Sequence, residues 1–239
     1  MFLYFFILYS LIIIMQPKRA VISLSGGMDS LVTLATAIEQ NYIPYALHVN
    51  YYQNTQEKEL KSFHSICDYY NIKEENKLVV DVDYLKKIGG TSLINGSYHK
   101  SDNQDEIPDS YVPFRNANIL SIATAWSEII QADAIFIGAS QIDYSGYPDC
   151  RKVFFDAFEK TILYGTKRAK PVKIIAPLLN MSKKDTVCEG VRLKVPFELS
   201  WSCYYNNDYA CGQCDSCKLR LKGFKEANVK DPILYKNNI

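Results

Sequence analysis

Serine, glycine and aspartate residues crowd the stretch Ala20–Leu34, which reads A-V-I-S-L-S-G-G-M-D-S-L-V-T-L. Gly26 and Gly27 allow positive φ and a close approach of backbone to a ligand, while Ser25 and Ser30 add hydroxyl donors. The apolar run before the glycines is typical of a buried strand, and apolar residues recur at helical spacing after them. A strand, a glycine turn and a helix N-terminus in this order predict an anion site.

Two common nucleotide loops are excluded here. No lysine follows the glycines as in G-x-x-x-x-G-K-[ST], and the spacing G-x-G-x-x-G of a dinucleotide fold is absent. Asp29 supplies a carboxylate suited to Mg²⁺, the ion that accompanies nucleotide phosphates. We therefore predict a nucleotide-phosphate site with Asp29 close to the metal.

Two further stretches carry side chains that suit a flat, polar substrate. Tyr111–Asn118 (Y-V-P-F-R-N-A-N) brings Arg115, and Ala139–Arg151 (A-S-Q-I-D-Y-S-G-Y-P-D-C-R) brings Asp149 and Arg151. A carboxylate accepts from two adjacent N–H groups of a guanine-like edge, and an arginine pairs with a carboxylate or a phosphate. The alternative, a surface turn without a binding role, stays open.

Four of the seven cysteines lie close together near the C-terminus, at Cys203, Cys211, Cys214 and Cys217. Four soft ligands on one knuckle suit a tetrahedral Zn²⁺ ion, which is then structural because no coordination position is open. The ferredoxin spacing is not completed, and disulfides between cysteines this close have poor geometry.

Alternating strand and helix patterns position these residues. Apolar runs predict five strands, at Ala20–Leu24, Tyr45–Val49, Lys77–Val82, Ala134–Gly138 and Lys173–Ala176. Helical periodicity predicts helices at Ser30–Gln40, Thr55–Tyr70, Asn116–Ile130, Val153–Tyr164 and Ser182–Leu193. The alternation predicts an α/β fold, a doubly wound, Rossmann-like parallel sheet with its ligand crevice at the carboxyl ends of the strands.

Composition restricts the class of protein. The chain has 239 residues, 48% of them hydrophobic, and a formal net charge of +1. This length predicts one domain with a small appendage, and near-neutral charge argues against a protein whose main task is to coat nucleic acid. An odd number of cysteines, mostly at one end, indicates a reducing compartment, so we expect a cytoplasmic location.

The segment Phe2–Ile14 is uncharged and apolar. It is shorter than the roughly 20 residues of a membrane span and lacks the basic and small-residue features of a signal peptide. We expect the working protein to start at Met15, with residues 1–15 an apolar extension outside the fold and no membrane partner. A membrane anchor is the alternative.

Three motifs together closely resemble the 7-cyano-7-deazaguanine synthase family of the ATP pyrophosphatase (PP-loop) superfamily: S-G-G-M-D-S, S-G-Y-P-D-C-R and the cysteine knuckle. The resemblance runs from about Lys18 to about Phe224, and S-G-Y-P-D-C-R is its most specific part. It implies an adenine nucleotide alpha hydrolase-like domain over 16–200 and a zinc-binding segment over 201–239 packed on it.

The resemblance implies an ATP-dependent ligase that converts 7-carboxy-7-deazaguanine and ammonia to 7-cyano-7-deazaguanine through adenylated intermediates, in queuosine biosynthesis. It also implies ATP, Mg²⁺ and one structural Zn²⁺ per chain, small-molecule partners without direct nucleic-acid binding, and a homodimer. The nucleotide-binding residues would be Leu24, Ser25, Gly26, Gly27, Met28, Asp29, Ser30, Leu31, Val32, Thr33 and Leu34. The catalytic candidates are Ser25, Asp29, Ser30, Arg115, Asp149 and Arg151, and Asp149 would read the guanine-like face.

The chain departs from the family pattern at two places. Phe114 stands where the family usually has glycine, and we expect a phenylalanine there to crowd the loop of Arg115 or to cover the substrate. The tract Tyr51–Asn54 is looser than the Y-G-Q typical of the family.

Two other functions stay open at this point. A tRNA-modifying sulfurtransferase of the same superfamily would need a catalytic cysteine pair near the ATP site and a basic face for tRNA. A zinc-knuckle module that binds RNA would show binding that decays with salt.

Overall fold

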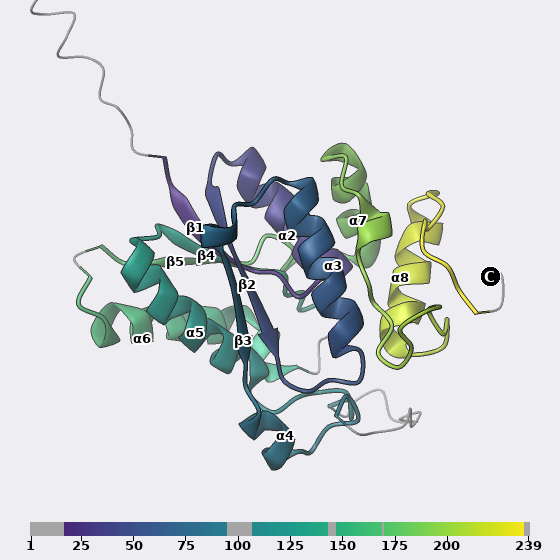
Figure 1. Cartoon of the computed structure of the whole chain (residues 1–239), viewed down its shortest axis with the longest axis horizontal. Helices are drawn as coiled ribbons and strands as arrows, with labels where there is room; N and C mark the ends of the chain where they lie inside the picture. Colours follow the sequence, from purple (N-terminus) through teal and green to yellow (C-terminus); the bar gives the residue numbers. More distant parts are fainter. Residues whose placement is uncertain (1–16, 95–106, 143–146, 169, 237–239) are drawn as a thin grey trace, which may run out of the picture.

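The computed structural model describes residues 17–94, 107–142, 147–168 and 170–236. Five strands form one parallel sheet in the order β3-β2-β1-β4-β5 (Figure 1). The strands are β1 Arg19–Ser23, β2 Ile43–Asn50, β3 Lys77–Asp81, β4 Ala134–Ile137 and β5 Lys173–Ile175. All five predicted strands are confirmed, and so is the predicted α/β fold class.

The strand order reverses at β1, the central strand. The chain runs from β1 through β2 to β3 on one side and then returns to place β4 and β5 on the other. In register, Val21 of β1 pairs with Tyr45 of β2 and with Ile135 of β4. Such a reversal leaves a crevice between the strands that diverge, outside their carboxyl ends.

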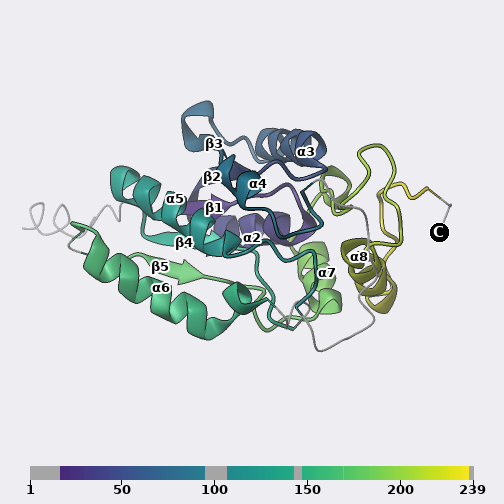
Figure 2. The same cartoon turned by 90° about the horizontal axis from the view of Figure 1, so that it is seen from below.

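Helices cover both faces of the sheet (Figures 1 and 2). One face packs against α2 Met28–Glu39, α3 Gln56–Tyr69, α7 Lys183–Arg192 and α8 Asp215–Glu226. The other face packs against α5 Arg115–Ile130 and α6 Lys152–Gly165, and the short α4 Tyr84–Ile88 follows β3. The result is a three-layered molecule with a core on each side of the sheet.

Successive side chains of β1 point alternately into the two cores. Ala20 and Ile22 belong to the core under α2, while Val21, between them, belongs to the core under α5. All three are fully buried. Successive side chains of a strand point to opposite faces, so a strand covered on both sides reads as an unbroken apolar run.

Local signals set where the helices begin. A capping box opens α7: the Asp185 N–H donates to Ser182 Oγ at 3.2 Å, and the Ser182 N–H donates to Asp185 Oδ2 at 3.1 Å. Such reciprocal bonds satisfy two N–H groups of the first turn. Helix α8 was not predicted, because half of its twelve residues are charged and it follows directly on the cysteine knuckle.

Parts of the predicted organisation lie outside the described residues. These are the apolar extension 1–15 and the first two residues, Ser145 and Gly146, of the S-G-Y-P-D-C-R motif. Over the part of the chain that the structure describes, no helix combines the length and the apolar character needed to cross a bilayer.

Candidate active site

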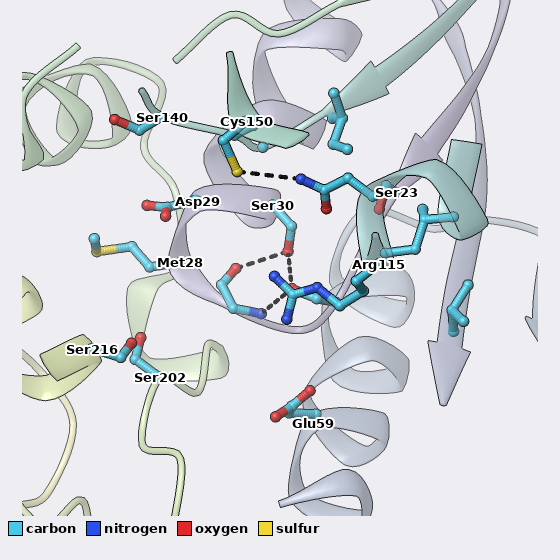
Figure 3. A pocket seen from close by; sticks show the side chains of 18 of the residues that line it. Ser23, Met28, Asp29, Ser30, Glu59, Arg115, Ser140, Cys150, Ser202 and Ser216 are labelled. Carbon is cyan, nitrogen blue, oxygen red and sulfur yellow. Dashed lines mark hydrogen bonds between the residues drawn. The ribbon is translucent and has the colours of Figure 1, made fainter. Parts of the chain in front are cut away.

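A cavity opens at the carboxyl ends of β1, β2 and β4, where the strand order reverses. We call it the central cavity (Figure 3). Its wall combines Ser23 and Val49 from the strands, the turn after β1, the start of α5, and Trp201 and Tyr204 from the C-terminal segment. The predicted ligand crevice is therefore where the alternation of elements placed it.

Backbone geometry explains the glycines of the turn after β1. Gly26 has a φ of +86°, and a Cβ built on it would lie 2.4 Å from the Glu59 carbonyl oxygen on α3, so a larger residue cannot stand there. The Gly26 carbonyl accepts from the Trp201 N–H at 2.9 Å. Ser25 Oγ accepts from the Gly27 N–H at 3.2 Å, which folds the turn onto the start of α2.

The predicted nucleotide-binding stretch divides into two groups. Ser25 Oγ and Ser30 Oγ lie 3.2 Å apart at the cavity, where the unpaired N–H groups of the first turn of α2 also lie. The residues of the stretch that line the central cavity are Ser25, Gly27, Met28, Asp29 and Ser30. Those buried in the core of the molecule are Leu24, Leu31, Val32, Thr33 and Leu34. The second group belongs to the packed core and supports the turn after β1.

A buried lysine that the sequence analysis did not single out lies beside the turn. Lys183, the first residue of α7, donates from Nζ to both carboxylate oxygens of Asp29, at 2.8 and 2.9 Å. The Lys183 side chain is only 5% exposed, and both residues line the central cavity. An ammonium group at this depth adds positive charge to the anion site.

Arg115 enters the cavity from the first turn of α5 (Figure 3). Its Nη1 donates to Tyr51 Oη at 3.1 Å, and its guanidinium lies 5.5 Å from the centre of the Tyr51 ring. Glu59 of α3 also lines the cavity and interacts electrostatically with Arg115. Burial raises the pKa of the Glu59 carboxyl, and hydrogen bonds from Thr55 and Gln53 oppose this shift.

Asp149 and Arg151 are not among the residues that line the central cavity, although Asp149 bonds to Asn116, which does line it. Asp149 is 3% exposed; its Oδ2 accepts from the Asn116 N–H at 2.9 Å, and its carbonyl accepts from Asn116 Nδ2 at 2.9 Å. The Asp149 carboxylate thus holds the first turn of α5, the helix that carries Arg115. Arg151 is exposed at the N-cap of α6, while Cys150 between them does line the cavity.

Phe114 does not line the central cavity. It precedes α5 with a φ of +57°, and its ring packs edge-on against Phe154 of α6 with centroids 6.2 Å apart. The side chain is 60% exposed. Arg115, the next residue, still reaches the cavity.

The four cysteines named from the sequence come together. The Sγ atoms of Cys203, Cys211, Cys214 and Cys217 all lie within 4.8 Å of one another. The N–H of Cys214 points to Cys211 Sγ at 3.3 Å, and Gly212 between them has a φ of +71°. Four thiolates at this spacing, with N–H groups directed at sulfur, fit a tetrahedral Zn²⁺ ion.

Arg220 lies on α8, the helix that also carries Cys217, and it connects this helix to the wall of the cavity. Arg220 is 1% exposed and donates to both carboxylate oxygens of Asp231, at 2.8 and 2.9 Å. It also donates to Ser200 Oγ at 2.8 Å and to Ser202 Oγ at 3.2 Å. The C-terminal residues that line the cavity are Trp201, Ser202, Tyr204, Ser216 and Arg220. A cluster that fixes this segment therefore also shapes one wall of the site.

Comparisons with known proteins agree over most of the chain. The family model described as queuosine biosynthesis protein QueC matches residues 19–228. The chain is similar to the 7-cyano-7-deazaguanine synthase of Chlorobium phaeobacteroides, with 53% identity over 220 residues that cover 91% of this chain and 96% of that relative. The same description applies to a relative from Chloroherpeton thalassium, with 50% identity over 221 residues, 91% of this chain and 97% of that relative. Among solved structures, the U34-tRNA thiolase NcsA from Methanococcus maripaludis aligns with a TM-score of 0.47 and 18% identity, covering 89% of this chain and 68% of that one.

Proposed function

The chain belongs to the QueC family of queuosine biosynthesis proteins and is a 7-cyano-7-deazaguanine synthase, and we propose that the synthase reaction takes place in its central cavity. We propose that it converts 7-carboxy-7-deazaguanine to the nitrile with ammonia and ATP. The observation that carries this proposal is that one cavity holds both the turn after β1, which is built to bind an anion, and the half-buried guanidinium of Arg115. These are the groups that adenylation of a carboxylate needs.

The first half of the reaction activates the carboxylate. A carboxylate is a poor electrophile, so its oxygen attacks the α-phosphorus of ATP, which gives an acyl adenylate and releases pyrophosphate. Ser25, Ser30 and the first turn of α2 would bind the departing pyrophosphate. Arg115 would meet the substrate carboxylate or the α-phosphate, because a guanidinium pairs with either.

The second half replaces the adenylate with nitrogen. Ammonia attacks the acyl carbon and AMP leaves, which yields a primary amide. A second adenylation at the amide oxygen, followed by loss of AMP and two protons, yields the nitrile. The same binding groups would serve both rounds, since the bond to phosphorus forms at the same place.

Asp29 and Lys183 support the binding of Mg²⁺ and phosphate together. Mg²⁺ is a hard cation that prefers carboxylate oxygens, and it would neutralise charge on the pyrophosphate. Both Asp29 oxygens accept from Lys183 Nζ, and each keeps a lone pair for the metal.

Two residue roles stay predictions. We propose that Asp149 acts chiefly by holding the first turn of α5, because its oxygen bonds to the Asn116 N–H. A direct reading of the substrate by Asp149, or a contact of Arg151 with phosphate, would require these side chains to reach the cavity on binding. We also propose the division into an adenylating domain, 16–200, and a zinc-holding segment, 201–239, acting in the cytoplasm.

Mass spectrometry of the products tests the reaction. The chain starting at Met15 is incubated with 7-carboxy-7-deazaguanine, ammonia, ATP and Mg²⁺, alongside the full chain. We expect 7-cyano-7-deazaguanine together with AMP and pyrophosphate, and no product without ATP. Release of ADP and phosphate instead would contradict adenylation.

A further inference from the structure

A carboxylate that none of the steps above uses lies in the central cavity. Glu59 lines the cavity from α3, and Arg115 enters the same space from α5 (Figure 3). We propose that Glu59 recognises the N–H edge of the deazaguanine ring, where N1–H and the 2-amino group lie next to each other. This inference rests on the proposed substrate and makes Glu59 a specificity-determining residue.

The Glu59 carboxylate is held in one orientation. Thr55 Oγ1 donates to Oε1 at 2.7 Å, and Gln53 Nε2 donates to Oε2 at 2.9 Å. Gln53 is itself fixed, because its Oε1 accepts from the Tyr51 N–H at 3.0 Å. A carboxylate has about four acceptor positions, so each oxygen keeps one for a ligand. Two adjacent N–H groups match two such positions.

Few other groups are available for this task. Of the described residues that line the central cavity, only Asp29 and Glu59 carry carboxylates. Asp29 pairs with Lys183 beside the turn after β1, which we propose binds phosphate. Asp149, the acid chosen from the sequence, directs its oxygen to the Asn116 N–H. Reading of an N–H edge by a carboxylate therefore falls to Glu59.

The neighbouring charge completes the match. A guanine-like ring presents its 6-oxo oxygen next to N1–H, and in this substrate the 7-carboxylate lies beside that oxygen. The ring thus offers acceptors and donors in adjacent positions along its rim. Arg115 and Glu59 offer the complementary groups: the cation suits the acceptors of the ring, and the anion suits its N–H donors.

Aromatic and apolar side chains of the wall suit two flat rings. Aromatic rings of Tyr51 and Tyr204 line the cavity together with Glu59, and they suit stacking on a heterocycle. The apolar side chains of Leu47, Val49, Ile119 and Ile137 also line the cavity. An adenine base can be held there by apolar contact and backbone groups, so it leaves Glu59 to the second ring.

Selectivity between two rings tests the proposal. The Glu59→Gln and Glu59→Asp variants are assayed with 7-carboxy-7-deazaguanine and with the analogue that lacks the 2-amino group. Glu57→Gln is the matched control, an exposed residue of the same helix. We expect wild type and the control to prefer the amino-bearing ring, and Glu59→Gln to lose about 10- to 100-fold in kcat/KM on that ring. The loss on the analogue should be much smaller, so the preference shrinks.

A merely structural role gives a different pattern. If Glu59 only supports the fold, both rings lose activity equally and the preference is unchanged, which overturns the proposal. A rise in KM for ATP with an unchanged KM for the ring also overturns it, since Glu59 would then contact the nucleotide.

Calorimetric binding of both rings, without ATP, separates this inference from the proposed reaction. A wild-type chain that prefers the amino-bearing ring, with the preference lost in Glu59→Gln, but that forms no nitrile, supports Glu59 and refutes the reaction. A chain that forms the nitrile with equal preference in every variant supports the reaction and refutes Glu59.

Discussion

At the scale of single residues, Lys183 is the group whose removal tells most about the phosphate site. It is the buried partner of Asp29 at the cavity, and its neighbour Lys184 is exposed. We expect Lys183→Met to lower kcat/KM for ATP by about 100-fold, because the cavity loses a positive charge beside the turn after β1 and the Asp29 carboxylate loses its partner. Lys184→Met should retain wild-type kinetics. Kinetics with ATP as the varied substrate give both values, and a Lys183→Met enzyme within twofold of wild type would contradict the role.

Residues of the site that are contiguous in the chain could be predicted from the sequence, whereas contacts between distant residues could not. Ser25, Asp29 and Ser30 were found because a strand, a glycine turn and a helix are contiguous in the chain. The Lys183–Asp29 contact joins residues that are 154 positions apart, and no local pattern encodes it. A lysine at the first position of a helix that follows the last strand was the one available signal.

Glu59 and Asp149 show that the sequence did not reveal which acidic side chain lines the central cavity. The motif containing Asp149 identified the family correctly, but which way a side chain faces depends on packing that a motif does not report. Glu59 stood in an ordinary charged run at the start of a helix. Only the fold reveals that this face of the helix lies beside the phosphate turn.

At the scale of elements, the entry to α5 carries backbone strain. Phe114 adopts a left-handed φ of +57° at the N-cap, a conformation that costs a non-glycine residue about 1 kcal/mol. Phe114→Gly should raise the free energy of unfolding by up to about 1 kcal/mol, since glycine suits both this φ and an N-cap. Urea denaturation measures the change.

Phe114→Ala is the matched control for that prediction. Alanine also loses the contact with Phe154 but keeps the strained φ, so it should be less stable than Phe114→Gly. Equal stabilities of the two variants would show that the backbone is not strained. Neither change should raise KM for the deazaguanine, because the phenyl ring lies outside the central cavity.

Regular elements were the part of the fold that sequence predicted well. Each predicted strand was an apolar run buried on both faces or at the sheet edge, and such runs need no knowledge of their partners. The sequence predicted a doubly wound parallel sheet but not the strand order β3-β2-β1-β4-β5, because the choice of neighbouring strands depends on long-range packing. Helix α8 was missed because the cysteine cluster, rather than an apolar stripe, sets its start at Asp215.

At the scale of the whole molecule, the C-terminal segment carries the cysteine cluster and also forms one wall of the central cavity, so we expect zinc binding and nucleotide binding to be coupled. We expect Cys214→Ser to bind less than one Zn²⁺ per chain and to bind ATP more weakly, because the segment it anchors supplies Trp201 and Ser202 to the cavity. Cys188→Ser, at an exposed cysteine outside the cluster, should change neither. Metal analysis by mass spectrometry and calorimetric titration with ATP check both. Full ATP affinity in a zinc-free chain would show that the two are independent.

The hydrogen bond from the Trp201 N–H to the Gly26 carbonyl also bears on how the protein is made. A ribosome finishes the phosphate turn early and must add most of the remaining chain before Trp201 can reach it. Until Trp201 has emerged from the ribosome, the turn after β1 lacks this hydrogen bond, and the central cavity lacks the wall that Trp201 and Ser202 supply. We therefore expect ATP to begin to stabilise the fold only after Trp201 has been added to the chain.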